Sequence, residues 1–291
     1  MTTAARPRKP LAGVRVGLLE RPDSPGRPGA LVDALVPALR AARADVRLVH
    51  AEEGHHRVDA APPWDVVVLK SGSAAALHLA AAAEGWGVPC VNSAAATGLA
   101  RDKVAVALLL QGAGLPVARS WAAWLGRGPG ESGGHGGGEG AGDQLDALAG
   151  RPLVVKAARG SRGEEVWSVP AGGLRAVASR LPPGPYLVME AVPHAGDDLK
   201  AYVAGDWLTA IERPFPARTL AAKVGRPVSL PAGVADVVRA AGALLGLTCF
   251  GVDFVRGPQG WVVVDVNAFP GYKGAEGAAE AIVSELARSL A

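Results

Sequence analysis

The stretches GVDFV (residues 251–255) and VDVNAFPG (residues 264–271) predict two apolar strands joined by a tight turn, each carrying polar side chains. Successive side chains of a strand point to opposite faces, so Asp265 and Asn267 share one face. In an antiparallel pair, Asp253 from the neighbouring strand can join them. Two carboxylates and an amide oxygen are ligands that suit Mg²⁺, so this pattern predicts a metal site that grips nucleotide phosphates. The alternative is that these polar residues end their strands and face water.

A second set of residues combines a lysine with a glycine-bearing turn. Lys156 closes the apolar strand LVVK (residues 153–156), and the turn RGSRG follows at residues 159–163. Glycines let backbone N–H groups approach phosphate oxygens, while a lysine at the strand end supplies a point charge. Taken alone, the pattern is most often only a turn; beside a magnesium site it favours phosphate binding. The sequence lacks GxxxxGK[ST], which disfavours a P-loop enzyme.

The order of these motifs resembles the ATP-grasp superfamily over nearly the whole chain from residue 65 onward. Within that superfamily the sequence is similar to two branches, the RimK-type carboxylate-amine ligases and the inositol trisphosphate kinases. The motifs that carry the resemblance are RDK (101–103), VK (155–156) with its glycine turn, MEAV (189–192), DLKAYVAG (198–205), ER (212–213), GVD (251–253) and DVN (265–267).

The resemblance implies which residues bind ATP. Lys103 and Lys156 would hold the α- and β-phosphates, and the glycine turn would cover them. A hinge between lobes, at Glu190 and Val192, would bind the adenine through backbone groups. Taken alone, Lys103 would be interpreted as a solvated residue in the first turn of a helix. The nucleotide-binding residues expected from the resemblance are Lys103, Lys156, Gly160, Ser161, Gly163, Glu190, Val192 and Asp198.

The resemblance also implies the catalytic and metal-binding residues. Asp198 matches the acid of the ligases' Asp-x-Arg element, whose basic member is Lys200 in this sequence. Arg213 would face the reacting phosphoryl group or the acceptor. The metal ligands would be Asp253, Asp265 and Asn267, and no side chain need act as a nucleophile, because positioning and charge neutralisation drive phosphoryl transfer.

The remaining pattern predicts α/β and α+β architecture. Residues 1–95 alternate β-branched runs with helical stretches, as in a parallel α/β lobe. With the resemblance, we expect an ATP-grasp fold in which a central lobe (96–190) and a C-terminal lobe with the metal site (191–291) are both α+β and clamp ATP. Residues 126–142 are mostly glycine and should form a flexible loop, because they bury nothing that offsets their ordering entropy.

Charge and hydropathy narrow the class of partner. Lys plus Arg is 30 and Asp plus Glu is 27, a net charge of +3 that is too small and too evenly spread to suggest nucleic-acid binding. No apolar run approaches the ~20 residues of a membrane span, so we expect a cytoplasmic protein without a membrane partner. The sequence leaves open whether the closing helix packs within the chain or in a homo-oligomer.

The two branches differ in the group that receives the phosphoryl group. A carboxylate gives an acyl phosphate that an amine attacks; a kinase phosphorylates an alcohol on a polyphosphorylated ring. NAFPGY (267–272) is similar to the kinases, whereas the turn after Lys156 is similar to the ligases, and residues 20–28 lack a lysine cluster. We favour the carboxylate-amine ligase, acting on a small polar or anionic acceptor such as an amino acid or peptide. The alternatives are the kinase and a non-catalytic nucleotide-binding module; the cofactors expected are ATP and Mg²⁺, with Mn²⁺ as a substitute.

Overall fold

The computed structural model describes residues 11–21, 30–126, 148, 150–159, 165–194, 196–214, 219, 222 and 224–291. The chain forms two compact units, each assembled from separate stretches. Unit 1 comprises Met1–Ala100, Gly196–Phe254 and Asp265–Ala291, and unit 2 comprises Arg101–Ala195 and Val255–Val264. The three-lobe division at residues 95 and 190 stays a prediction, and most of the glycine-rich segment 126–142 lies outside the described residues.

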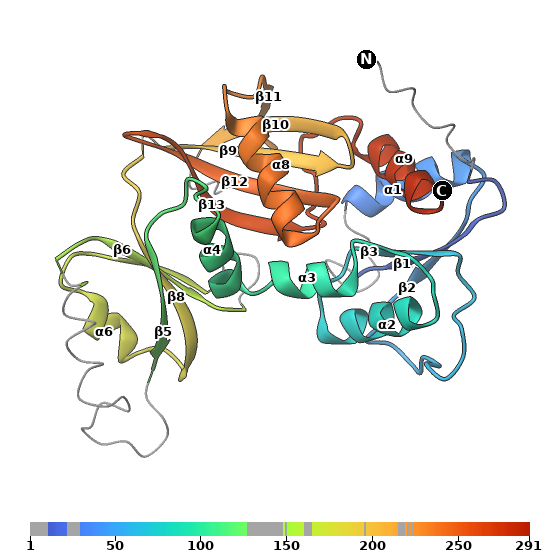
Figure 1. Ribbon diagram of the computed structural model, residues 1–291, viewed down its shortest axis with the longest axis horizontal. Coiled ribbons are helices and arrows are strands. Elements are labelled where there is room, and N and C mark those ends of the chain that lie inside the picture. The colour runs from blue at the N-terminus through green and yellow to red at the C-terminus, as the bar shows by residue number, and fades with distance from the viewer. Residues whose placement is uncertain are drawn as a thin grey trace. The chain divides into compact units, whose positions relative to one another are not determined.

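Along the chain, the helices and strands labelled in Figure 1 belong first to unit 1, then to unit 2, and then to unit 1 again. Strands β12 (Cys249–Gly257) and β13 (Gly260–Ala268) run across the boundary between them. The other elements of unit 1 are β1 (Arg15–Leu19), α1 (Ala30–Ala41), β2 (Asp45–Val49), β3 (Val66–Leu69), α2 (Ala74–Gly85), β4 (Cys90–Val91), α3 (Ala94–Ala100), β9 (Asp197–Ala204), β10 (Trp207–Pro214), β11 (Arg226–Val228), α8 (Val234–Leu245) and α9 (Ala278–Ser289). Those of unit 2 are α4 (Lys103–Gly112), β5 (Ser120–Leu125), β6 (Leu153–Ala157), β7 (Val166–Val169), α6 (Leu174–Ala178) and β8 (Gly184–Glu190).

A parallel sheet of order β2-β1-β3-β4 opens unit 1. Val16 and Leu18 of β1 pack on one face with α1 and α9, whereas Leu19 packs on the other face with α2. Burial of both faces explains why β3 reads as the unbroken apolar run VVVL, since a strand covered on both sides needs no polar alternation.

A second sheet, of order β11-β10-β9-β12-β13, lies in unit 1 except for residues 255–264 of β12, β13 and the turn between them. Helix α9 joins the two sheets of the unit, because Ile282 and Leu286 share one buried cluster with α1, β1 and residues of β9 and β10. The closing helix therefore packs within its own chain. Tyr272 strengthens this junction by donating its hydroxyl hydrogen to the carbonyl of Val203 at 2.6 Å.

Unit 2 is built on an antiparallel sheet of order β5-β8-β6-β7. Alternate side chains of its strands face two separate clusters, one with Leu174 of α6 and one with Val104 and Ala107 of α4. The tip of the β12–β13 hairpin joins this unit, because the N–H of Val263 donates to the carbonyl of Pro116 at 2.7 Å. The parallel and antiparallel sheets together confirm the predicted α/β and α+β class.

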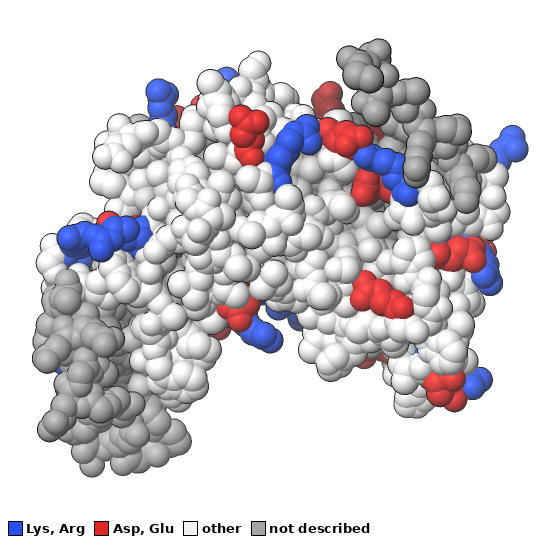
Figure 2. All heavy atoms as spheres, in the orientation of Figure 1, with Lys and Arg blue, Asp and Glu red and all other residues white. Residues whose placement is uncertain are grey.

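Acidic and basic side chains are mixed over the described surface that Figure 2 shows, and several of them pair. Arg15 contacts Asp65 at 2.7 Å, and Arg288 contacts Asp206 at 2.6 Å. Among the residues that the structure describes, no helix has the length and apolar character needed to cross a bilayer.

Candidate active site

The centre of the candidate site is an ion pair between strands β9 and β12. The ammonium of Lys200 lies 2.7 Å from Oδ1 and 3.0 Å from Oδ2 of Asp253. Both side chains are largely buried, with exposures of 12% and 15%. Asn267 of β13 donates its amide to Oδ2 of Asp253 at 3.4 Å, so the predicted convergence of these two residues is found.

A second ion pair follows on the neighbouring strand. Arg213 of β10 lies directly opposite Asp198 of β9 in the antiparallel ladder. Its Nε donates to Oδ1 at 2.7 Å and its Nη2 to Oδ2 at 2.8 Å, a two-point contact that fixes the plane of the guanidinium. Cross-strand neighbours of opposite charge are brought together by the register itself, so the ladder positions this pair.

Strand alternation explains why the two pairs share one face. Asp198, Lys200 and Tyr202 are spaced by two along β9 and therefore point the same way. The ammonium of Lys200 stands 5.8 Å from the centre of the Tyr202 ring, within reach of a cation–π contact. Tyr202 was not among the predicted site residues, although its i+2 spacing from Lys200 was the signal that could have found it.

The electrostatics of this face are set by burial and pairing together. Burial has the largest single effect and would lower the pKa of Lys200, but the opposing effects, led by the charge of Asp253, together raise it. Burial likewise opposes the charge of Arg213, whose pKa is nevertheless raised by its hydrogen bonds to Asp198. For Asp198 burial dominates and raises the pKa, with Arg213 offsetting only part of the shift. Both cations thus stay charged at neutral pH.

The donor set fits a divalent cation. Oδ1 of Asp253 is buried and has no hydrogen-bond partner among the described residues, although the Lys200 ammonium lies close to it. A buried carboxylate oxygen without a hydrogen bond is costly, and a cation beside it removes that cost. Asp265 lies two residues before Asn267 on the same strand, and its Oδ1 accepts from the N–H of Val266 at 3.1 Å. Hard oxygen donors of this kind suit Mg²⁺.

Unit 2 contains both predicted phosphate-binding lysines, and a backbone hydrogen bond joins the two segments that carry them. Lys156 is buried at the end of β6, and its ammonium donates to the carbonyl of Val264 at 2.6 Å. Lys103 is the first residue of α4, and its N–H donates to the carbonyl of Ala158 at 2.8 Å, two residues beyond Lys156. Asp102 caps this helix by accepting from Ala105 N–H at 3.0 Å.

The predicted hinge residues lie at the end of strand β8 in unit 2: Glu190 is its last residue, and Val192 follows it. Glu190 is paired by two arginines, forming a short contact with Arg151 and a 3.9 Å contact with Arg119. Val192 packs against the α4 face of the sheet and crowds Gly257 of β12, where an added Cβ would lie 2.9 Å from its Cγ1. Neither arginine was predicted as a site residue. Both reach Glu190 only because the strands next to them pair with β8, and a local sequence pattern does not show that pairing. Gly160, Ser161 and Gly163 lie outside the described residues.

The site strands are anchored by a residue that sequence reasoning missed. Asn92 is 2% exposed, and its amide donates to the carbonyl of Cys249 at 2.7 Å. Its Oδ1 accepts from the N–H groups of Thr248 at 2.9 Å and Cys249 at 2.8 Å. This side chain therefore fixes the start of β12, four residues before Asp253. A lone asparagine more than 150 positions away gives no local signal of such a role.

The chain is similar in sequence and fold to several known proteins. No family model matches the chain. A protein described as a probable alpha-L-glutamate ligase from Sodalis glossinidius (strain morsitans) is 30% identical over 249 residues, covering 80% of this chain and 79% of that protein. The crystal structure of a RimK domain ATP-grasp protein from Sphaerobacter thermophilus DSM 20745 matches with a TM-score of 0.70 and 23% identity, covering 95% of this chain and 99% of that one.

A third match is the ATP-grasp ligase PsnB, solved with the precursor peptide PsnA2 and AMPPNP. It has a TM-score of 0.63 and 21% identity, and the match covers 96% of this chain and 97% of that one. The same ligase has also been solved with Mg and ADP. The fold is therefore the ATP-grasp fold. Together with the relative named as a glutamate ligase, it defines the class of protein as an ATP-grasp ligase.

The chain belongs to the family of RimK-type α-L-glutamate ligases, as its identity to the Sodalis protein over most of both chains shows. It is thus an ATP-dependent ligase that forms C–N bonds. The resemblance to the inositol trisphosphate kinases is not confirmed, and the kinase alternative gives way to the ligase.

Proposed function

We propose that this enzyme joins an amino acid to the carboxylate of a small or peptidic acceptor through an acyl phosphate. The names of its relatives favour L-glutamate as one substrate. The observation that carries the proposal is the pair of buried ion pairs, Lys200–Asp253 and Arg213–Asp198, on one sheet face. Such a face combines fixed cations with oxygen ligands for a metal. Transfer of a phosphoryl group from ATP to a carboxylate requires both, because donor and acceptor are anions.

The proposed reaction runs in two steps. A carboxylate oxygen of the acceptor attacks the γ-phosphorus of ATP while the bond to the β,γ-bridging oxygen breaks, and ADP leaves with that electron pair. The amine nitrogen then attacks the acyl carbon of the acyl phosphate; the C–O bond breaks, inorganic phosphate leaves, and the amine loses a proton. Arg213 and Lys200 neutralise charge that builds on the transferring group, a contribution that preorganised cations make without reorganisation.

The remaining predicted residues take supporting roles in this proposal. Mg²⁺ bound by Asp253, Asp265 and Asn267 would supply charge neutralisation for the phosphates, and Mn²⁺ would substitute for it. The lysines Lys103 and Lys156 would bind the α- and β-phosphates. The nucleotide would also meet the turn at Gly160, Ser161 and Gly163 and the hinge at Glu190 and Val192.

The test is ATP turnover with a panel of amino acids and acidic peptides in the presence of hydroxylamine. Acceptor-dependent ADP release together with hydroxamate formation is the expected result, because hydroxylamine traps an acyl phosphate. The variant Asp253→Asn should lower kcat/KM by about a hundredfold or more. The matched control Asp236→Asn, at an exposed aspartate of α8, should leave it unchanged.

Two outcomes would count against the proposal. One is ADP release without hydroxamate for every acceptor that stimulates turnover, which would mean that no acyl phosphate forms. The other is equal activity of the Asp253→Asn and Asp236→Asn variants, which would remove the metal-binding role of this face.

A further inference from the structure

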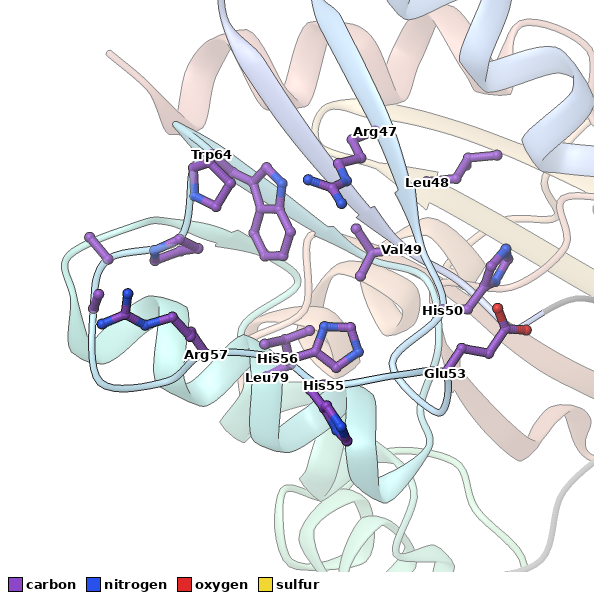
Figure 3. Close-up of a pocket in the computed structure, with 14 residues that line it drawn as sticks. Arg47, Leu48, Val49, His50, Glu53, His55, His56, Arg57, Trp64 and Leu79 are labelled. Carbon is purple, nitrogen blue, oxygen red and sulfur yellow. The ribbon is translucent and has the colours of Figure 1, made fainter.

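A pocket of about 480 Å³ lies in unit 1 where the connection from β2 to β3 passes over the parallel sheet (Figure 3). Parallel strands are usually joined through a crossover helix that covers one sheet face. Residues 50–65, all of them described, contain no helix, so this part of the sheet is covered by a loop instead. The pocket is the space between this loop, strand β2 and Leu79 of α2.

Trp64 lines the pocket and packs against a glycine of the parallel sheet. Trp64 lies over Gly17 of β1 so closely that an added Cβ on Gly17 would be 2.4 Å from the indole ring. Trp64 is 8% exposed, and its indole N–H is buried without a hydrogen-bond partner among the described residues. A buried N–H donor without an acceptor is costly and rare, so its presence beside a pocket needs an explanation.

An arginine occupies the adjacent position on the same sheet face. Arg47 of β2 pairs in register with Gly17, so its side chain and the indole over Gly17 lie on one side of the sheet. Figure 3 shows the guanidinium of Arg47 reaching from β2 toward Trp64. No hydrogen bond or ion pair of the Arg47 side chain is formed with the described residues. Two hydrogen-bond donors without a partner among the described residues thus lie on the same side of the sheet.

The loop adds further basic groups to the pocket. His55 and His56 line it and, within the described part of the chain, form no side-chain hydrogen bond. Arg57 is already matched by Asp59 at 2.9 Å, so its charge is balanced. Among the described residues that line the pocket, Glu53 alone is acidic. The Arg47 guanidinium and the Trp64 indole N–H can only donate hydrogen bonds, which favours an anionic ligand over a cation.

We propose that this pocket binds a small organic anion, with its carboxylate or phosphate group held by Arg47 and the indole N–H of Trp64. Bidentate contacts from arginine are strong for both kinds of head group. Pro62, Pro63 and Leu79 supply an apolar wall, so the ligand carries an apolar body as well as a charge. A metal ion fits less well, since the described residues contain no group of three or more His, Cys, Asp or Glu side chains placed to hold one.

This site is separate from the residues proposed to perform ligation. None of Lys200, Arg213, Asp253 or Asn267 lines the pocket. Failure of the anion site therefore leaves the proposed ligase chemistry untouched, and each can be tested without the other.

The experiment follows the tryptophan indole N–H signals of the ¹⁵N-labelled full chain by NMR during titration with benzoate and with phenyl phosphate. The Trp64 signal is identified by its loss in the Trp64→Phe variant. Saturable movement of this signal, with a Kd at or below about 1 mM for at least one probe, is expected. The variant Arg47→Gln should weaken binding by about tenfold or more, because it removes a charge-assisted contact.

The matched control is Arg40→Gln, which removes the same charge from an exposed position at the end of α1. Binding by this variant should equal that of the wild type. The proposal is overturned if neither probe moves the Trp64 signal, or if Arg40→Gln weakens binding as much as Arg47→Gln, which would indicate attraction by net charge alone.

A kinetic comparison then identifies the source of the anion. If the pocket holds the distal acidic group of the acceptor, Arg47→Gln raises the KM of the acceptor and leaves that of ATP unchanged. If it holds a separate effector, both KM values are unchanged, and the probe alters the rate of the wild type but not of the variant.

Discussion

The ammonium of Lys200 lies 2.7 Å from Oδ1 of Asp253, so a side chain of the protein itself neutralises a carboxylate proposed to bind the metal. Lysine carries one positive charge on a flexible stem, and a divalent cation would compete with it for the same oxygen. Binding of Mg²⁺ and release of Lys200 toward the reacting groups would then be coupled.

The variant Lys200→Met tests this coupling. Removing one partner of a buried ion pair should lower the free energy of unfolding by about 3 kcal/mol, because the Asp253 charge loses its partner. Added MgCl₂ should raise the Tm of the variant more than that of the wild type. Lys200→Arg keeps the charge and serves as the control. Equal effects of MgCl₂ on the wild type and Lys200→Met would contradict the competition.

The pH dependence of stability should report the buried carboxyl group of Asp198. Burial raises its pKa in the folded protein above the ordinary value of 3.8. Between that value and the raised one, the folded state holds more protons than the unfolded state. The stability that this group contributes is therefore complete below pH 3.8 and is lost as pH rises through the folded pKa.

Urea unfolding of the wild type and of Asp198→Asn at a series of pH values checks this sign. The free energy of unfolding of the wild type minus that of the variant should fall as pH rises through this window, and then level off. A difference that grows with pH would mean that the Arg213 contact outweighs burial and that the pKa of Asp198 is lowered.

The anchoring of β12 predicts a large effect at Asn92. The variant Asn92→Ala leaves the N–H groups of Thr248 and Cys249 without their acceptor and should cost about 3 kcal/mol of stability. Hydrogen exchange of these two amides should accelerate. The neighbouring Ser93→Ala removes only the cap that accepts from Ala96 and should cost about 1 kcal/mol. Equal losses for the two variants would argue against the anchor.

The contact between Trp64 and Gly17 predicts that Gly17→Ala is destabilising, by about 1–3 kcal/mol, because the added methyl group meets a buried ring. Gly98 is the matched control: it lies in α3, and an added Cβ there meets nothing within 4 Å. Gly98→Ala should be stabilising by up to about 1 kcal/mol. Urea unfolding of both variants provides the measurement. A neutral Gly17→Ala would mean that the indole moves aside at no cost.

The sequence pattern predicted the elements whose signals are local. The bounds of helix α8, Val234–Leu245, can be read from the sequence, because its apolar residues recur at helical spacing between two glycines. Helix α3 was missed, since AAATGLA contains no contrast between apolar and polar faces. Strand β11 was also missed, because three residues become a strand only by pairing with β10.

In the candidate site, too, the contacts with a local sequence signal were predicted and those that depend on long-range pairing were not. The meeting of Asp253 with Asn267 followed from strand alternation and a tight turn. The pairing of Lys200 with Asp253 did not, because it depends on how β9 and β12 align, and no residue pattern within either strand fixes that register. Arg119 and Arg151, which pair with Glu190, and Asn92 were also missed, because their contacts join segments that lie far apart in the sequence.

Unit 1 is completed only by the final stretch of the chain. Leu31 and Leu35 of α1 pack in one cluster with Ile282 and Leu286 of α9. During synthesis on a ribosome, these early apolar side chains emerge long before the residues that cover them. The nascent chain must therefore carry an uncovered apolar face on α1 until α9 has been synthesised.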